Sequence, residues 1–260
     1  RNLMPIDLDA IKNRLQTLQQ TTSRTSNLWK PSPGTQQIRM LPYKHNKDNP
    51  FIELYFHYDI GAKSYLSPVS FGRPDPFVEF ADKLKSTGNR DDYMLAKKLE
   101  PKMRTFVPVA VRGEEDQPVR FWGFGKMVYQ ELLGFISDPD YGDLTDPITG
   151  RDIVVEFQSA EETGRSFPKT TIRVKPNQTK ATEDETRYDS WTNGQKKITD
   201  VYTELSYEEL TEVLHVWLNP DDKDESSETV TKPSGPTDKT AGNANKVEDV
   251  SEAFDQLFNS

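Results

Sequence analysis

The stretch KMRTFVPVAVRGEEDQPVRFWGFGKMVYQELLGFI, residues 102–136, decides the fold that the sequence predicts. Residues 104–113 and 117–124 are rich in β-forming side chains, and the acidic turn GEED joins them as two strands. Residues 126–136 then change to a helical period. The apolar side of this helix is expected to be formed by Met127, Val128, Leu132, Leu133 and Ile136. The block therefore predicts two neighbouring strands that lead directly into a helix.

Further strands are predicted on both sides of this block. Their sequences are TQQIRMLPYK (35–44), FIELYFHY (51–58) with GAKSYLSPVSF (61–71) as its hairpin partner, RDIVVEFQ (151–158) and SFPKTTIRVK (166–175). Two short amphipathic helices are expected between residues 74 and 101, with an apolar core of Phe77, Phe80, Leu84, Met94 and Leu95. Strands, then a helix, then strands favour a fold that is mainly β with inserted helices, namely a five-stranded, partly open barrel of the OB type.

The chain divides by composition into three regions. Residues 1–28 hold a predicted helix (6–20) and a polar linker, a possible element for self-association. Residues 29–218 form the predicted OB-fold core, with the helical insertion at about 74–101 and a C-terminal helix at 206–218 that opens with a capping box of Ser206 and Glu209. Residues 219–260 form a low-complexity, acidic tail that is expected to be disordered. No secondary structure is assigned to 176–205.

Composition limits the chemistry that is open to this chain. The 260 residues include no cysteine, which removes disulfides, thiolate zinc sites and cysteine nucleophiles and suits a reducing compartment. The three histidines, His45, His57 and His215, are too scattered to build a zinc site without cysteine. Neither a GxxxxGK nor a GxGxxG motif is present, and the acidic loop 138–152 lacks the spacing of a calcium loop. We therefore expect no enzyme, no cofactor and no metal.

Membrane association and secretion are not expected. Apolar runs are only a handful of residues long, far below the length of a membrane span. The N-terminal sequence RNLMPIDLDAIKNRL has no apolar signal core. The sequence therefore predicts a soluble, intracellular protein.

Charge is distributed unevenly along the chain. The net charge of −9 by itself disfavours a nucleic-acid partner. Residues 219–260 contribute −6 of it, with ten acidic residues and four lysines, whereas residues 30–112 carry a net +5. A basic body with an acidic tail leaves nucleic-acid binding open.

Aromatic and cationic residues alternate along the predicted strands. Single-stranded nucleic acid binds where cations follow the backbone path and rings offer faces on which bases stack. Alternate strand residues point to opposite faces, so we predict that Trp122 of FWGF (121–124) is exposed, although half or more of the rings are expected in the core. The predicted DNA-binding residues are Arg39, Tyr43, Lys44, Tyr55, Tyr58, Lys97, Lys98, Lys102, Arg104, Phe106, Arg112, Arg120, Trp122, Phe124, Lys126, Phe167 and Arg173.

This order of elements resembles the single-stranded DNA-binding, helix-destabilising proteins of T-even-type tailed phages. The resemblance is carried by IRMLPYK (38–44), the block 102–136, RDIVVEFQ and SFPKTTIRV. It extends from the N-terminal helix to about residue 175, and again through the acidic tail. It implies an OB-fold core, cooperative self-association along the strand through the N-terminal region, and a tail that contacts replication proteins.

Residue by residue, the resemblance implies DNA contacts for Lys102, Arg104, Phe106, Trp122 and Phe167. Gly123 departs from the family, which usually has a cation there. The best-known members also carry a His/Cys zinc site in the insertion, so this chain resembles a variant without that site. Only SRTS (23–26) faintly matches the family's basic, hydroxyl-rich N-terminal motif, and a flexible linker is the favoured interpretation of it.

The acidic tail ends in AFDQLF (253–258), which places large apolar residues among acids. A tethered acidic segment can compete with DNA for a basic groove. Strand binding would then leave the end of the tail free for partners, with Phe254, Leu257 and Phe258 as the predicted anchors. A tail that only solubilises the chain is the alternative.

The sequence thus predicts a non-enzymatic protein that binds single-stranded DNA with sequence tolerance in phage DNA replication, recombination and repair. It would coat and protect exposed strands in the cytoplasm of the infected bacterial host, and recruit replication proteins through its tail. The alternatives are a single-stranded RNA-binding regulator, and a phage structural or assembly protein that uses the aromatic strands as a protein interface.

Overall fold

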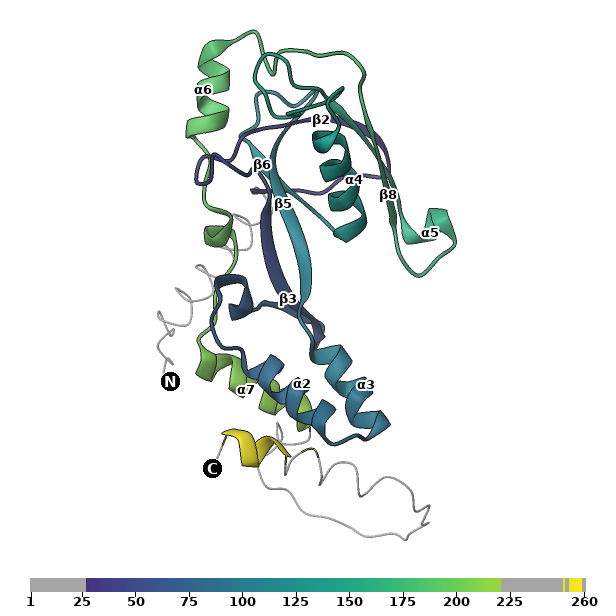
Figure 1. The fold of residues 1–260 in the computed structure, drawn as a ribbon, viewed down its shortest axis with the longest axis vertical. Helices are drawn as coiled ribbons and strands as arrows, with labels where there is room; N and C mark the ends of the chain where they lie inside the picture. The colour runs from purple at the N-terminus through teal and green to yellow at the C-terminus, as the bar shows by residue number, and fades with distance from the viewer. Residues whose placement is uncertain (1–26, 221–249, 251–252, 259–260) are drawn as a thin grey trace, which may run out of the picture. The chain divides into compact units, whose positions relative to one another are not determined.

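The computed structural model describes residues 27–220, residue 250 and residues 253–258 (Figure 1). The helix predicted at 6–20, the SRTS motif and most of the acidic tail lie outside the described residues. The chain divides into two compact units, each described by itself. The sheet unit comprises the described residues up to Leu54 together with Met103–Thr203, and the helical unit comprises Tyr55–Lys102 and the described residues from Glu204 onward.

The sheet unit is built on strands in the order β1-β6-β5-β2-β7-β8. The short strand β1 (Leu28–Trp29) pairs in parallel with β6 (Arg120–Phe124), and the other neighbouring pairs in this order are antiparallel. The other strands are β2 (Gly34–Met40), β5 (Lys102–Val111), β7 (Ile153–Gln158) and β8 (Lys169–Val174). Strands are therefore present at each of the five places where the sequence predicts them in this unit.

The helix α4 (Lys126–Ser137) follows β6 directly, as predicted, and lies beside β8 in Figure 1. Its buried residues Val128, Tyr129 and Leu132 join the core of the sheet. Met127 is 84 % exposed and Leu133 is 40 % exposed, so their predicted place on the apolar side is wrong. The buried stripe of this helix is narrower than its apolar composition indicates.

The segment that the sequence left unassigned, 176–205, contains α6 (Glu185–Asn193) and the 3-10 helix η2 (Ile198–Val201). Trp191 of α6 is buried in a small apolar cluster with Leu41, Ala110 and Ala181. A short helix, α5 (Ala160–Thr163), also stands in the connection between β7 and β8, where the sequence predicted only a link. The segment 176–205 thus contributes Ala181 and Trp191 to a cluster with Ala110 of β5 and with Leu41, which follows β2.

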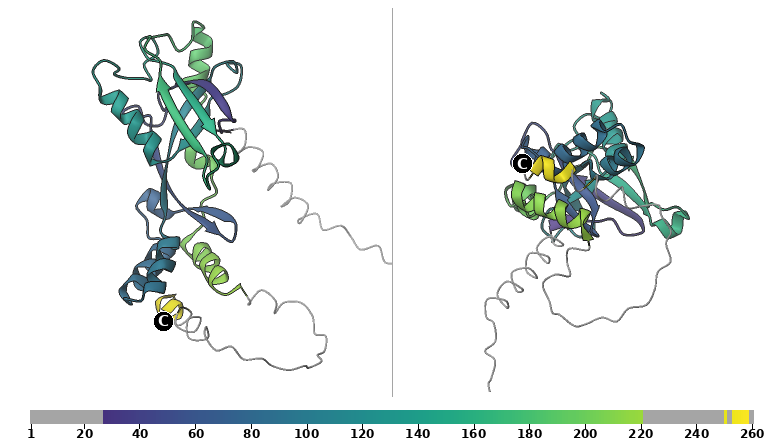
Figure 2. Two further views of the ribbon diagram at one scale, coloured as in Figure 1. Left: turned by 90° about the vertical axis from the view of Figure 1, so that its right-hand side faces the viewer. Right: turned by 90° about the horizontal axis from the view of Figure 1, so that it is seen from below.

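The helical unit packs α2 (Pro76–Ser86), α3 (Arg90–Leu99) and α7 (Tyr207–Leu218) around one apolar core. A hairpin of β3 (Ile52–Ile60) and β4 (Lys63–Leu66) and the 3-10 helix η1 (Pro68–Phe71) precede α2, with the start of β3 in the sheet unit. Residues 253–258 form a further short helix, drawn in yellow, that lies against the helices of this unit in Figures 1 and 2.

Local sequence explains where these helices begin. The Asp75 carboxylate accepts a hydrogen bond from the Phe77 N–H, with Pro76 as the first helical residue of α2. The predicted capping box of Ser206 and Glu209 opens α7. Met94, predicted in the core, is 55 % exposed, and Leu95 is only partly buried. The core residues are Ile60, Phe77, Phe80, Ala81, Leu84, Ala96, Leu99, Leu210, Leu214 and Phe254.

The described residues thus form a mixed α/β fold with a large open β-sheet and helices between and after its strands. Among the residues that the structure describes, no helix combines the length and the apolar character needed to cross a bilayer.

Candidate nucleic-acid interface

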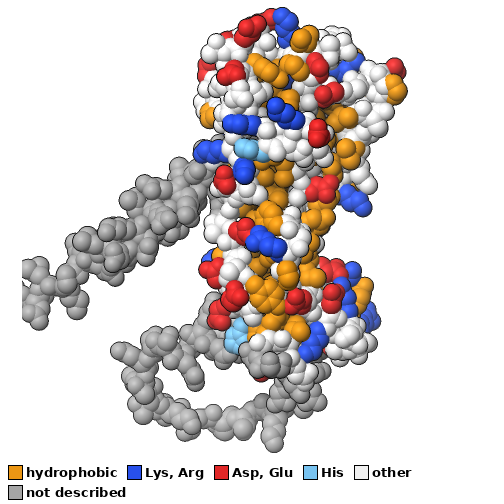
Figure 3. Space-filling model, turned by 60° about the vertical axis from the view of Figure 1, so that its left-hand side comes forward, with side chains coloured by type: hydrophobic (Ala, Val, Ile, Leu, Met, Phe, Trp, Pro, Cys, Tyr) orange, Lys and Arg blue, Asp and Glu red, His pale blue; other side chains and the backbone are white. Residues whose placement is uncertain are grey.

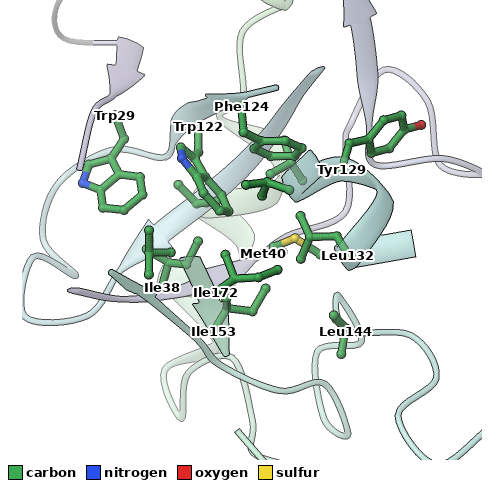
Figure 4. Packing of buried hydrophobic residues seen from close by; sticks show 14 of the residues in the cluster. Trp29, Ile38, Met40, Trp122, Phe124, Tyr129, Leu132, Leu144, Ile153 and Ile172 are labelled. Carbon is green, nitrogen blue, oxygen red and sulfur yellow. The ribbon is translucent and has the colours of Figure 1, made fainter. Parts of the chain in front are cut away.

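The rings of FWGF are core residues on both faces of β6. Trp122 is 1 % exposed and packs edge-on against Trp29 of β1 at 5.8 Å between ring centroids. Figure 4 shows Trp122 and Phe124 pointing into the same cluster as Met40 and Leu132. Phe121, on the opposite face, is 3 % exposed and meets Tyr43 at 5.9 Å. The prediction that Trp122 is exposed is therefore wrong. The core cluster that includes Met40 and Leu132 covers its face of β6, and Tyr43 packs against Phe121 on the other face.

Phe124, Tyr43 and Phe106 are also buried, which corrects their predicted place on a binding surface. The Tyr43 hydroxyl accepts a hydrogen bond from the Ile198 N–H at 3.2 Å. Phe106 of β5 lies opposite Gly123 of β6, and its ring occupies the space that a side chain at Gly123 would need. A Cβ atom at Gly123 would lie 2.7 Å from Cε1 of Phe106, so glycine is required there for packing.

Arg39 and Arg112 bind Asp152 and are not surface cations. Arg112 reaches both carboxylate oxygens, with Nη2 2.8 Å from Oδ1 and Nε 2.9 Å from Oδ2. The fully buried Arg39 donates to Oδ1 at 3.2 Å and to the Thr179 carbonyl at 2.6 Å. Burial raises the pKa of the Asp152 carboxyl, but the hydrogen bonds and charge of Arg112 outweigh it and leave the pKa lowered. The prediction that Arg39 contacts DNA is wrong in this structure, since its guanidinium is enclosed.

Other predicted cations also have partners. Arg120 forms an ion pair with Glu114 in the turn that joins β5 to β6. Lys97 pairs with Glu100 at 3.1 Å, and Lys44, although exposed, donates to the Asn193 carbonyl at 2.6 Å. Surface ion pairs contribute little free energy, so these cations could exchange their present partners for phosphates. None of them is free of a protein partner in this structure.

The hairpin of β7 and β8 brings one predicted ring together with cations. Phe167 is 78 % exposed and stands two residues before β8. On β8, Ile172 and Val174 are buried, whereas Lys169, Thr171 and Arg173 are exposed on the opposite face. We call Arg165, Phe167, Lys169 and Arg173 the hairpin patch; all four are exposed.

The hairpin patch is only moderately basic. Glu156 of β7 pairs with Thr171 and is exposed, so an acid lies between Lys169 and Arg173. A ligand that uses the hairpin patch must therefore gain affinity from the ring as well as from charge.

The view in Figure 3 brings forward the side opposite to β8 and α5. On that face, Lys and Arg side chains are interspersed with Asp and Glu and do not form one basic stripe.

The remaining predicted residues are divided between the two units. In the sheet unit, Arg104 and Lys126 are exposed, and Arg104 donates to the Gly123 carbonyl at 2.7 Å. In the helical unit, Lys98 and Lys102 are exposed and Tyr55 and Tyr58 are half-buried. The tail anchors Phe254, Leu257 and Phe258 pack on the helical unit.

Sequence reasoning missed Arg165 and Asp152. Arg165 follows the turn residue Gly164, and its position before Phe167 in GRSF was the available signal. Asp152 had no local signal, because its arginine partners are 40 and 113 residues away. Within the described residues, no cluster of three His, Asp or Glu side chains could hold a metal ion.

Comparison with protein-family models and with curated proteins found no match to this chain.

Proposed function

We propose that this protein binds single-stranded DNA with little sequence preference, and that the hairpin patch is its principal contact. One observation carries the proposal. Phe167, a large apolar ring, is 78 % exposed two residues before Lys169, and Lys169 and Arg173 lie on the same exposed face of β8. Exposed rings beside cations are what a sequence-tolerant single-strand site needs, since every base has a face that stacks.

The spacing along β8 suits a strand of nucleic acid. Lys169 and Arg173 are four residues apart, which is about 13 Å along an extended chain. Each can therefore meet a different phosphate while Phe167 stacks on a base at the end of the hairpin. Stacking on one ring contributes about 1–3 kcal/mol per base.

We further propose that β2, β5, β6, β7 and β8 form an OB-type sheet. In chain order these are the first to fifth strands, and their order across the sheet is third, second, first, fourth, fifth. The helix α4 stands between the third and fourth of them. A helix between strands of a five-stranded, partly open sheet supports the OB interpretation, as does the resemblance carried by 102–136.

The role that fits this activity is the coating of exposed strands during phage DNA replication, recombination and repair. This role rests on the resemblance to the helix-destabilising phage proteins. Cooperative binding through residues 1–28 and contact of the tail with replication proteins belong to the same proposal. No catalytic step is required of the chain in this role.

The test is fluorescence anisotropy of labelled oligo-dT titrated with the full chain at several salt concentrations. Affinity should fall as salt rises and should be weaker for duplex DNA. Phe167→Ala should raise Kd about 5- to 150-fold, the equivalent of about 1–3 kcal/mol. Ile148→Ala is the matched control, because Ile148 is an apolar residue of the same unit that is 65 % exposed and lies outside the hairpin patch.

Lys169→Ala and Arg173→Ala should each reduce the slope of log K against log salt by about 0.7, the loss of one phosphate contact. The proposal is overturned if the full chain does not bind oligo-dT, or if Phe167→Ala binds as tightly as the unaltered chain. Tighter binding to a ribo-oligomer would replace it with the RNA-binding alternative.

A further inference from the structure

The end of the acidic tail is seated on the helical unit. Phe254 is 3 % exposed and packs against Phe80 of α2 at 5.9 Å and His215 of α7 at 5.2 Å between ring centroids. Phe258, one helical turn later, meets Phe254 at 4.7 Å and Tyr207 at 6.4 Å. We call residues 253–258 the terminal helix, and the surface formed by Phe80, Lys83, Tyr207 and His215 its seat.

A polar contact fixes the position of the terminal helix on this seat. The Lys83 ammonium donates to the Ala253 carbonyl at 2.8 Å and to Oε1 of Gln256 at 3.4 Å. The apolar residues Phe254, Leu257 and Phe258 follow the i, i+3, i+4 spacing of one helix face. Apolar anchors at this spacing are how an amphipathic helix is usually recognised by an apolar surface.

The terminal helix depends on its seat, but the seat does not depend on the terminal helix. Six residues are too few for a helix that is stable alone, so docking must supply its stability. The seat is built on α2 and α7, whose core residues Phe77, Leu84, Leu210 and Leu214 pack together. Removal of the terminal helix would therefore uncover the side of Phe80 that packs against Phe254, while α2 and α7 still hold the seat together.

The covalent connection allows the terminal helix to leave. Residues 221–249 separate Pro220 from Val250, and 29 residues can span up to about 100 Å when fully extended. A tethered segment of this kind has an effective concentration on the order of 1 mM at its own site. Even with modest intrinsic affinity, the terminal helix thus occupies its seat most of the time. A competing ligand can still displace it.

We propose that this seat is a binding site for a short amphipathic helix, and that its resident ligand is the terminal helix of the same chain. While it is seated, Phe254 is buried and the tail cannot present it to another protein. A partner that recognises the tail must therefore compete with the seat. This inference does not rest on the binding of nucleic acid.

The first test uses a labelled peptide of residues 247–260 and full-length protein. The peptide should bind to a Phe254→Ala/Phe258→Ala chain, whose own terminal helix is disabled. If the intrinsic Kd is on the order of 100 µM, the unaltered chain should bind the peptide about tenfold more weakly, because its seat is occupied. Adding Lys83→Ala to the disabled chain should weaken peptide binding about tenfold. Lys85→Ala is the matched control, since Lys85 of the same helix pairs with Glu100 and Asp82.

A second measurement identifies which copy supplies the terminal helix. The chain has no native cysteine, so Lys83→Cys and Gln256→Cys place two thiols that a short bismaleimide can join. The double variant should crosslink within one chain and run as a monomer. Equal peptide binding to the unaltered and disabled chains, or no binding to either, overturns the proposal. Crosslinked dimers from a mixture of the two single variants also overturn it, and assign the seat to a second copy.

Discussion

His57 and Asp75 form a fully buried ion pair in the helical unit, with Nε2 of His57 2.8 Å from Oδ2 of Asp75. The other ring nitrogen, Nδ1, lies 2.8 Å from the Leu99 carbonyl oxygen, which can only accept a hydrogen bond. Both ring nitrogens of His57 therefore lie within hydrogen-bonding distance of an oxygen atom. Asp75 also accepts from the Ser67 hydroxyl and from the Phe77 N–H. This buried pair thus joins β3, the end of α3 and the start of α2.

Replacing His57 with alanine should destabilise the helical unit strongly. The change leaves the Asp75 carboxylate buried without its charged partner, which costs about 3–5 kcal/mol. Amide hydrogen exchange of α2 and α3 should show the loss as faster exchange. His45→Ala is the control, because His45 is exposed, and should change the free energy of unfolding by less than about 0.5 kcal/mol. Unchanged exchange in His57→Ala would contradict the ion-pair assignment.

The same pair predicts how stability depends on acid. Burial raises the pKa of the Asp75 carboxyl, but hydrogen bonds from His57 and Ser67 and the charge of His57 outweigh it, so the pKa lies below its ordinary value of 3.8. A lowered pKa in the folded state gives stability that is present above the unfolded value and is lost as the pH falls through the folded value. Urea unfolding between pH 7 and pH 2 should show this loss below about pH 4. Asp75→Asn should have a lower free energy of unfolding at pH 7 and should lose less of it between pH 7 and pH 2. If both chains lost the same free energy over this range, the assignment of the loss to Asp75 would be contradicted.

The secondary structure could be predicted because its signals are local. The change of period at Lys126 marks α4, and the pair Ser206 and Glu209 marks the start of α7. The exposure of single rings could not be predicted in the same way. Alternation along β6 predicts that Phe121 and Trp122 point to opposite faces of the sheet. It does not predict whether other segments of the chain cover each face. Trp122 packs in one cluster with Met40, and Phe121 packs against Tyr43, and both partners come from segments far away in the sequence.

The prediction that Arg39 contacts DNA is wrong for a related reason. When only its neighbours in the sequence are considered, Arg39 looks like an exposed cation that could contact DNA. Its partner Asp152 is 113 residues away, and only the pairing of β2 with β7 brings the two together. Phe167, which the resemblance placed among the DNA contacts, is exposed, and its contact with DNA stays a prediction.

Gly123 offers a test of packing against charge. The resemblance places a cation at this position, yet a Cβ atom would lie 2.7 Å from the buried Phe106 ring and 3.1 Å from Nε of Arg104. Gly123→Ala should therefore lower the free energy of unfolding by about 1–3 kcal/mol through overpacking. Gly134→Ala is the control, since Gly134 lies in α4 with nothing near its Cβ position, and should stabilise by up to about 1 kcal/mol. Urea unfolding of both variants measures these changes. If Gly123→Lys folded stably and bound DNA more tightly, a cation that contacts DNA at this position would be supported instead.

Substitution of Trp122 should affect folding stability, whereas substitution of Phe167 should affect DNA binding. Trp122 is 1 % exposed, so Trp122→Ala opens a cavity in the sheet core and should cost about 3–5 kcal/mol of folding free energy. Phe167 is 78 % exposed, so Phe167→Ala should change that free energy by less than about 0.5 kcal/mol. Thermal unfolding and oligo-dT anisotropy on the same samples test both statements. Below its lowered melting temperature, the folded Trp122→Ala chain should keep its affinity, because the indole does not reach the surface. If the folded Trp122→Ala chain lost affinity while Phe167→Ala kept it, the binding surface would have to be moved from the hairpin patch to β6.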